Sequence, residues 1–199
     1  MCDLFLTVGP DAPTLAGDWT TRDLAAHLVV RERRPDAGPG IISGFLRGYS
    51  ERVRVAERER PWTEIVERVR KGPPVWNPMH IDVVDRFANT VEFFVHHEDV
   101  RRAAPQWSPR ELDEELEAGL MESIRRAGGM LTRKATVGLT LAADDDDPIR
   151  LRKGTPMITI SGPIGECVLY LYGRKDVAAV KLDGPDEAVA SVAETPFGL

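Results

Sequence analysis

Two of the four histidines have neighbours that point to a shared chemical site. Glu92 and His96 are four residues apart, which places both side chains on one face of a helix. His27 lies between Leu24 and Leu28, on the side of another helix that is expected to be buried. Imidazole nitrogen and carboxylate oxygen suit zinc and also permit nickel, manganese or iron. The pattern therefore makes His27, Glu92 and His96 candidate ligands of one divalent metal ion.

The spacing also has an interpretation without a metal. A histidine beside leucines is commonly a satisfied interior residue, and a glutamate four residues before a histidine is commonly a surface pair. Adjacent helical residues point about 100° apart, so His97 shares its face with Phe93 and not with Glu92. His80 falls at the beginning of a predicted helix, where a cap or loop position is the favoured interpretation.

Charged residues close to the histidines have two interpretations each. Asp99 follows His96 by three residues and Asp23 precedes His27 by four, so each carboxylate is a candidate to orient an imidazole. Surface charge without a role is the alternative for both. Arg31, one helical turn after His27, either holds an anionic substrate or extends into solvent.

Helices separated by proline and glycine are predicted for the first half of the chain, because proline cannot continue a helix. Thr20 with Asp23 resembles a capping box. The strongest pattern is an apolar stripe on the last of these helices, formed by Val84, Phe87, Val91, Phe94 and Val95. The predicted helices cover about 1–8, 20–34, 41–60, 62–71 and 81–104. Short connections between them predict an antiparallel four-helix bundle over 1–105.

After Pro105 the pattern changes to mixed strands and helices, which predicts a small α+β domain over 106–199. A helix over about 109–127 is expected to begin at a Ser108 cap and to end at Gly128 and Gly129. A turn is expected at Asp144–Asp147. Strands are predicted at 135–142, 149–152, 157–161 and 177–182, and further helices at about 163–172 and 185–192.

The composition excludes several classes of protein. A net charge of −6 with 29% charged residues argues against a broad basic face for nucleic acid. No apolar run approaches the roughly 18 residues that span a bilayer, so no membrane partner is expected. Cys2 and Cys167 cannot form a disulfide framework, which favours a reducing cytoplasm, and Cys167 fits a packed thiol better than a nucleophile. The first helix lacks a cap, which suggests that the natural chain begins upstream of Met1.

Two motifs resemble the mycothiol-dependent maleylpyruvate isomerase family of the DinB-like superfamily. The stretch 18–28 (DWTTRDLAAHL) looks like its first metal motif, and 91–102 (VEFFVHHEDVRR) looks like its second. The segments 160–163, 173–174 and 182–184 are similar to its C-terminal domain, so the resemblance extends from residue 15 to about 190. It is closest to a metal-binding subgroup.

This resemblance implies a fold and a site. The N-terminal part would be a DinB-like four-helix bundle, and the family's histidine, glutamate and histidine ligands carry over onto His27, Glu92 and His96. Arg174 matches an arginine of the C-terminal motif and is a candidate to bind the thiol cosubstrate or the substrate.

The expected function is a thiol-dependent isomerase or transferase. Three protein ligands leave a coordination position open, as in catalytic zinc sites, and mycothiol is the thiol that the resemblance implies. A metal-activated thiolate would then react with a small electrophile. A non-catalytic metal protein is the alternative, and a fourth ligand such as His97 or Asp99 would favour it. Regulatory binding through the C-terminal domain is a third hypothesis.

Overall fold

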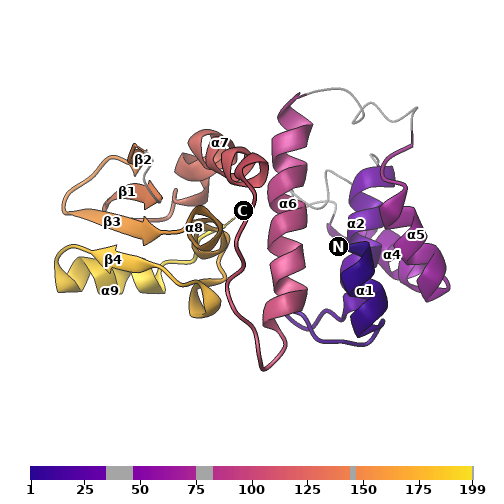
Figure 1. Cartoon of the computed structure of the whole chain (residues 1–199). Coiled ribbons are helices and arrows are strands. Elements are labelled where there is room, and N and C mark those ends of the chain that lie inside the picture. Colours follow the sequence, from indigo (N-terminus) through magenta and orange to yellow (C-terminus); the bar gives the residue numbers. More distant parts are fainter. Residues whose placement is uncertain (35–46, 75–82, 144–146, 199) are drawn as a thin grey trace. The chain divides into compact units, whose positions relative to one another are not determined.

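The computed structural model describes residues 1–34, 47–74, 83–143 and 147–198. These residues form eight α-helices and a four-stranded sheet, which confirms a mixed α and β fold (Figure 1). The chain makes two compact units: Met1–Arg86 with His96–Trp107, and Phe87–Val95 with Ser108–Leu199. The predicted division into 1–105 and 106–199 concerns folding domains and stays a prediction, because compactness does not establish independent folding.

Helices make up the first unit in its described parts. Helix α2 (Thr21–Arg33) packs against α4 (Arg47–Arg58) and α5 (Trp62–Arg70), and α1 (Cys2–Val8) packs against α5 (Figure 1). The predicted helices at 1–8, 20–34 and 62–71 are confirmed within one or two residues. The predicted beginning of the third helix at Ile41 lies outside the described residues. The four-helix bundle itself stays a proposal.

Helix α2 is buried along most of its length, and its first turn is fixed by the predicted capping box. The Asp23 amide donates to Thr20 Oγ1 over 3.5 Å, and the Thr20 amide donates to Asp23 Oδ2 over 3.1 Å. These two bonds satisfy amides that have no partner within the helix. Leu24 and Leu28 are fully buried, so the apolar side of α2 faces the interior as the sequence predicts.

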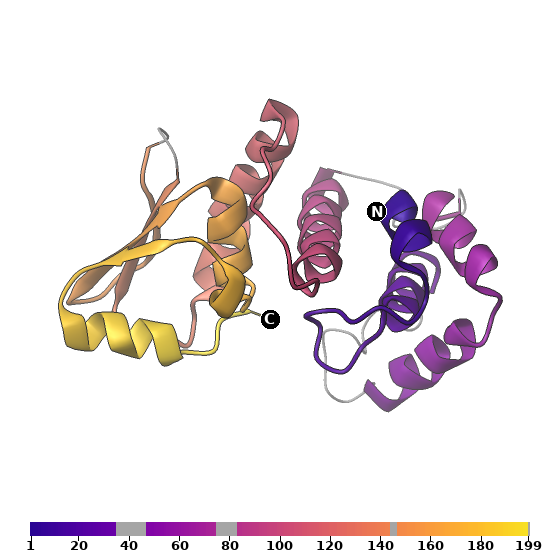
Figure 2. The ribbon, with the colours of Figure 1, turned by 60° about the horizontal axis from the view of Figure 1, so that its bottom comes forward.

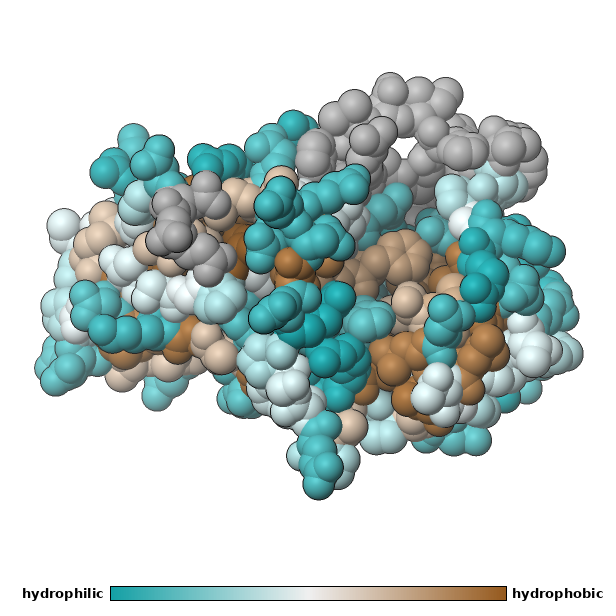
Figure 3. All heavy atoms as spheres, in the orientation of Figure 1, coloured by the Kyte–Doolittle hydropathy of each residue, from teal (hydrophilic) through white to brown (hydrophobic). Residues whose placement is uncertain are grey.

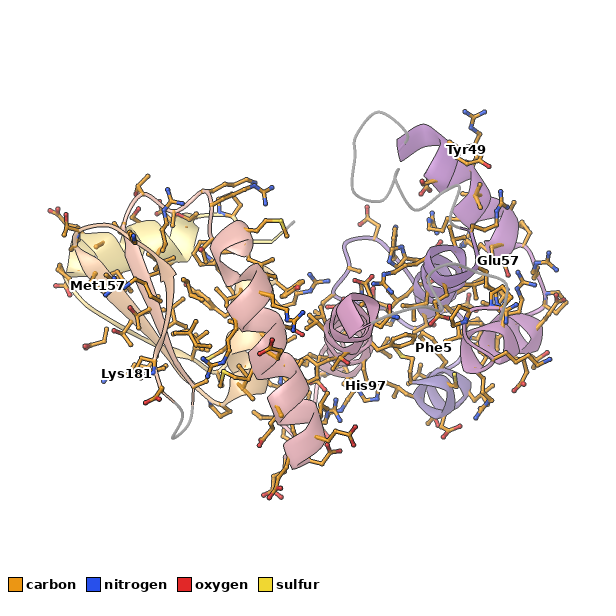
Figure 4. The ribbon with its side chains drawn as sticks, turned by 90° about the horizontal axis from the view of Figure 1, so that it is seen from above. Phe5, Tyr49, Glu57, His97, Met157 and Lys181 are labelled. Atoms are coloured by element: carbon orange, nitrogen blue, oxygen red, sulfur yellow. The ribbon has the colours of Figure 1, made fainter. Side chains whose placement is uncertain are left out.

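Phe5 anchors α1 to α5. Its ring is fully buried and meets the Trp62 ring edge-on, with centroids 5.7 Å apart, and Figure 4 shows Phe5 among the neighbouring helices of this unit. Leu6 and Val8 of the same helix are 49% and 39% exposed. Figure 3 shows hydrophobic side chains gathered around this helix, whereas hydrophilic side chains cover most of the visible face.

Helix α6 (Val83–Arg102) is continuous and contributes to both units. Val91, Phe94 and Val95 belong to the hydrophobic core of the second unit, as the predicted apolar stripe requires. The following turns, from His96 onward, belong to the first unit. A helix that buries more than one face keeps its polar residues in enclosed surroundings, which matters for the chemistry of this one.

The second unit is built on a sheet with the strand order β2-β1-β3-β4. Strand β1 (Gly138–Ala143) pairs antiparallel with β2 (Ile149–Arg152) and parallel with β3 (Met157–Gly162), and β3 pairs antiparallel with β4 (Lys181–Asp183). Leu139, Leu141, Ile158 and Ile160 are fully buried on one face. Besides the Phe87–Val95 part of α6, the helices of this unit are α7 (Glu114–Leu131), α8 (Ile164–Leu171), the 3-10 helix η3 (Lys175–Val177) and α9 (Asp186–Glu194). Helices α7 and α8 lie on the same side of the sheet (Figures 1 and 2).

Three local predictions for this unit are wrong. Helix α7 begins five residues later than predicted, at Glu114, because Asp113 and not Ser108 caps it: the Leu116 amide donates to Asp113 Oδ1 over 2.8 Å. It also continues through Gly128 and Gly129. A Cβ on Gly128 would lie 2.5 Å from the Leu151 side chain, so this glycine lets β2 approach the helix and does not end it. The strand predicted at 177–182 is shorter than expected: η3 ends at Val177, residues 178–180 form neither helix nor strand, and β4 begins only at Lys181.

No helix in the described ranges is both long and apolar enough to cross a bilayer. The predicted turn at Asp144–Asp147 falls mainly outside the described residues.

Candidate metal centre

The structure brings together the three residues that the spacing selects. One ligand atom from each of His27, Glu92 and His96 lies within 4.8 Å of the others. The imidazoles of His27 and His96 meet edge to face, with ring centroids 5.3 Å apart and planes at 78°. Both histidines are more than nine-tenths buried, and Glu92 is half-buried. The three side chains therefore form one polar cluster between α2 and α6.

The positions of Glu92 and His96 follow from α6 alone. Four residues along a helix return a side chain to nearly the same direction, so the carboxylate and the imidazole lie one above the other. The core residues Val91, Phe94 and Val95 flank them and set the rotation of the helix. His27 comes from α2, whose rotation is set in the same way by the buried Leu24 and Leu28.

Trp19 contacts His27 from just before the cap of α2. The ring centroids of Trp19 and His27 are 5.2 Å apart, and the Arg54 guanidinium lies 4.8 Å from the centroid of the Trp19 ring. Trp19 lies within the first motif, eight residues before His27, and this position was the available sequence signal for the contact.

Asp99 faces His96 from three residues farther along α6. Its Oδ2 lies 2.9 Å from His96 Nδ1, and the Asp99 residue is fully buried. The predicted contact between this carboxylate and the imidazole is confirmed, and the alternative of a surface charge is wrong for Asp99.

Asp23 is engaged in the first turn of α2 and in a charged cluster. Its carboxylate pairs with Arg54 and with Arg58 Nε, the latter at 2.9 Å, in addition to the bonds with Thr20. Burial by itself raises the pKa of Asp23, but hydrogen bonds from Arg54 and Thr20 outweigh it, and the pKa is lowered. These contacts give Asp23 a structural role, while its predicted action on His27 stays a prediction.

Glu98 is a buried acid that was not among the candidates predicted from the sequence. It is fully buried and accepts from Arg101 Nη1 over 2.9 Å and from Arg102 Nε over 2.8 Å. Arg102 in turn lies over the Trp107 ring, 4.5 Å from its centroid. Arginines three and four residues after a glutamate are a recognisable helical ion-pair pattern, so the sequence contained the signal.

The remaining candidates do not belong to the group His27, Glu92 and His96. His97 on α6 (Figure 4) is placed with Nδ1 3.7 Å from Glu98 Oε1. Cys167 is fully buried, and its thiol lies 3.4 Å from the Gly162 carbonyl oxygen, so the prediction of a packed thiol is confirmed. Arg174 belongs to the second unit, where its guanidinium donates to the Tyr172 carbonyl over 2.6 Å. His80 lies outside the described residues.

The donor set fits a zinc ion. In a tetrahedral zinc site with bonds of about 2.0–2.2 Å to nitrogen and oxygen, the ligand atoms lie about 3.3–3.6 Å apart. The ligand atoms here lie within 4.8 Å of one another, so the side chains would move closer together to hold an ion. Two imidazoles and one carboxylate are also a recognised ligand combination of catalytic zinc. The residues present are therefore suited to one divalent cation.

No family model, curated protein or solved structure matches this chain. The chain is therefore described by its fold and its cluster. It is a mixed α and β protein in which two histidines and a glutamate form a group that could hold a metal ion.

Proposed function

We propose that this protein binds one divalent metal ion, zinc in preference to others, through His27, Glu92 and His96. The observation that carries the proposal is the convergence of these three ligand atoms within 4.8 Å, although His27 on α2 lies more than 60 residues from Glu92 and His96 on α6 in the chain. Burying imidazoles and a carboxylate together is costly unless they are paired or ligate a metal.

The function that fits this centre is a thiol-dependent isomerase or transferase acting on a small electrophile. A divalent ion held by three protein ligands supplies a Lewis acid with an open position, at which a thiol is converted to thiolate. The residues of this chain would hold the ion from one side and exclude water with the buried faces of α2 and α6. Mycothiol as the thiol, and Arg174 as a residue that binds it or the substrate, rest on the family resemblance of the two motifs.

A non-catalytic metal protein is the second candidate. In that protein the ion would only join α2 to α6, and a fourth protein ligand would be expected to close the coordination sphere. Asp99, a fourth ligand considered from the sequence, presents an oxygen to His96 Nδ1. This contact favours a site with a position left open.

Metal analysis of the purified chain tests the site. We expect about one zinc per chain after dialysis, and almost none in His96→Ala. His97→Ala is the matched control, because it removes an imidazole from the adjacent position, whose side chain points in another direction, and it should retain the metal. Stoichiometric zinc in His96→Ala would reject the assignment.

A thiol-consumption assay over a panel of electrophiles tests the reaction. The zinc-loaded protein is mixed with mycothiol or another small thiol and with electron-poor alkenes or substrates with leaving groups. Loss of thiol that needs both the metal and Glu92 supports the enzyme. Full zinc occupancy with no reaction across the panel favours the structural alternative.

A further inference from the structure

Asp99 has a different hydrogen-bonding partner from Glu98, the acid that precedes it in the chain. Glu98 accepts hydrogen bonds from both following arginines, Arg101 and Arg102. Asp99 instead presents Oδ2 to the Nδ1 atom of His96 at 2.9 Å, and its residue is fully buried. Two adjacent buried carboxylates on one helix thus serve two different partners, one cationic and one imidazole.

The chemistry of the pair decides which nitrogen of His96 is available. A carboxylate accepts hydrogen bonds, so the proton of a neutral His96 ring lies on Nδ1 and donates to Asp99. The lone pair is then on Nε2, on the opposite side of the ring. Metal-binding histidines commonly donate their second ring N–H to a carboxylate or a carbonyl, which fixes the orientation of the ring and increases its basicity.

We propose that Asp99 is a positioning residue for the metal centre: it holds His96 in the tautomer and rotamer that present Nε2 to the ion. This inference rests on the proposed metal site and deepens it. The position of Asp99 is itself fixed, because its backbone carbonyl accepts a hydrogen bond from the Leu15 amide over 3.1 Å. The backbone at Asp99 is therefore held both by α6 and by the segment that precedes α2.

The alternative is that Asp99 and His96 merely satisfy one another in a packed interior. Removing Asp99 would then change the stability of the fold but not the coordination of an ion. The spectrum of bound cobalt separates the two possibilities, because the d–d absorption of Co²⁺ in a zinc site depends on the identity and geometry of its ligands.

The experiment titrates Co²⁺ and Zn²⁺ into the full chain and into Asp99→Asn, Asp99→Ala and Glu98→Gln. We expect Asp99→Ala to bind zinc about 10–100-fold more weakly and to show a changed cobalt spectrum. Asp99→Asn keeps an acceptor oxygen but loses the charge, so its affinity should lie between those of Asp99→Ala and the parent. Glu98→Gln is the matched control: it alters the adjacent buried carboxylate, and its cobalt spectrum should be that of the parent.

The outcomes are distinguishable. A parent chain that binds neither cobalt nor zinc overturns the proposed metal site itself. A parent that binds both, beside Asp99 variants with unchanged affinity and spectrum, overturns the positioning role and leaves the site standing. If circular dichroism shows that Asp99→Ala does not fold, the spectrum and affinity of Asp99→Asn decide: parent values reject the role, and altered values support it.

Discussion

The indole of Trp19 and the imidazole of His27 lie with ring centroids 5.2 Å apart and planes tilted by 48°. Trp19 precedes the capping box of α2, and His27 lies two helical turns later, so the loop before the helix folds back toward the ring that the helix presents. A chromophore thus lies directly beside one of the proposed metal ligands.

This neighbour provides an optical test of the site. A paramagnetic ion such as Co²⁺ quenches the emission of an indole held close to it, so adding Co²⁺ should reduce the tryptophan fluorescence of the parent in a saturable manner. Trp19→Phe should lose most of this decrease. Trp62→Phe, which alters the indole packed on Phe5, should keep it. An equal decrease in the Trp19→Phe protein would show that the ion binds elsewhere.

Metal binding should also stabilise the folded chain. A ligand that binds only the native state stabilises it by about 2.7 kcal/mol when its free concentration is 100 times its dissociation constant. Thermal unfolding of the metal-free protein should therefore shift upward when zinc is added, and the shift should be absent in His27→Ala, whose ligand comes from α2. An equal shift in both proteins would place the stabilising ion outside the proposed cluster.

The residue patterns predicted the helical first unit and the three candidate ligands because both depend on local periodicity. Each of these features lies within one helix. The capping box of Thr20 and Asp23 belongs to α2, and the four-residue spacing of Glu92 and His96 belongs to α6. The beginning and end of α7 were not predictable in this way. The helix continues through Gly128, and glycine is required there because Leu151, more than 20 residues away, packs where a Cβ would lie. No local sequence pattern contains that contact.

The contact between Asp99 and His96 was foreseen only as one of two alternatives, because spacing does not reveal burial. Asp99 and Glu98 are fully buried, and that burial depends on residues far away in the chain. For the same reason Glu98 was not a candidate from the sequence. Its spacing to the following arginines is that of an ordinary exposed ion pair, and its burial is seen only in the folded structure.

The buried Glu98 should be costly to remove. Its loss removes the carboxylate that pairs with Arg102 at 2.8 Å. Arg102 is 4% exposed, and breaking a buried pair costs about 3–5 kcal/mol. Urea denaturation of Glu98→Ala should show this decrease in the free energy of unfolding. Glu122→Ala is the control, because its partner Arg126 is exposed and such pairs contribute at most about 1 kcal/mol. Similar losses in the two variants would contradict the burial of Glu98.

Acid should weaken the first unit through Asp23. Hydrogen bonds hold its folded-state pKa below the value in the unfolded chain, despite its burial. The ionised carboxylate therefore stabilises the fold above the ordinary carboxyl pKa, and this contribution is lost as the pH falls through the lowered folded-state pKa. Asp23→Asn should be less stable than the parent at neutral pH, and the difference should shrink in acid. A difference that stays constant with pH would show that the charge of Asp23 is not responsible.

Alanine substitutions at Gly138 and Gly129 should have different effects on the free energy of unfolding. A Cβ on Gly138, the first residue of β1, would overlap the backbone carbonyl oxygen of Gly154, and a backbone atom moves aside less easily than the end of a flexible side chain. Gly138→Ala should therefore lower the free energy of unfolding by about 1–3 kcal/mol. On Gly129, within α7, the Cβ would meet the Leu151 carbonyl oxygen at 3.4 Å, an ordinary contact.

Because alanine favours a helix over glycine by about 1 kcal/mol, Gly129→Ala should be neutral or stabilising. Urea denaturation of both variants beside the parent measures the two effects on one scale. A Gly138→Ala protein as stable as the parent would mean that β1 and the Gly154 segment are not in close contact. A strongly destabilised Gly129→Ala would place the end of α7 where the sequence alone predicted it, before the glycine pair, because alanine at a position that ends a helix loses the conformational freedom that glycine supplies.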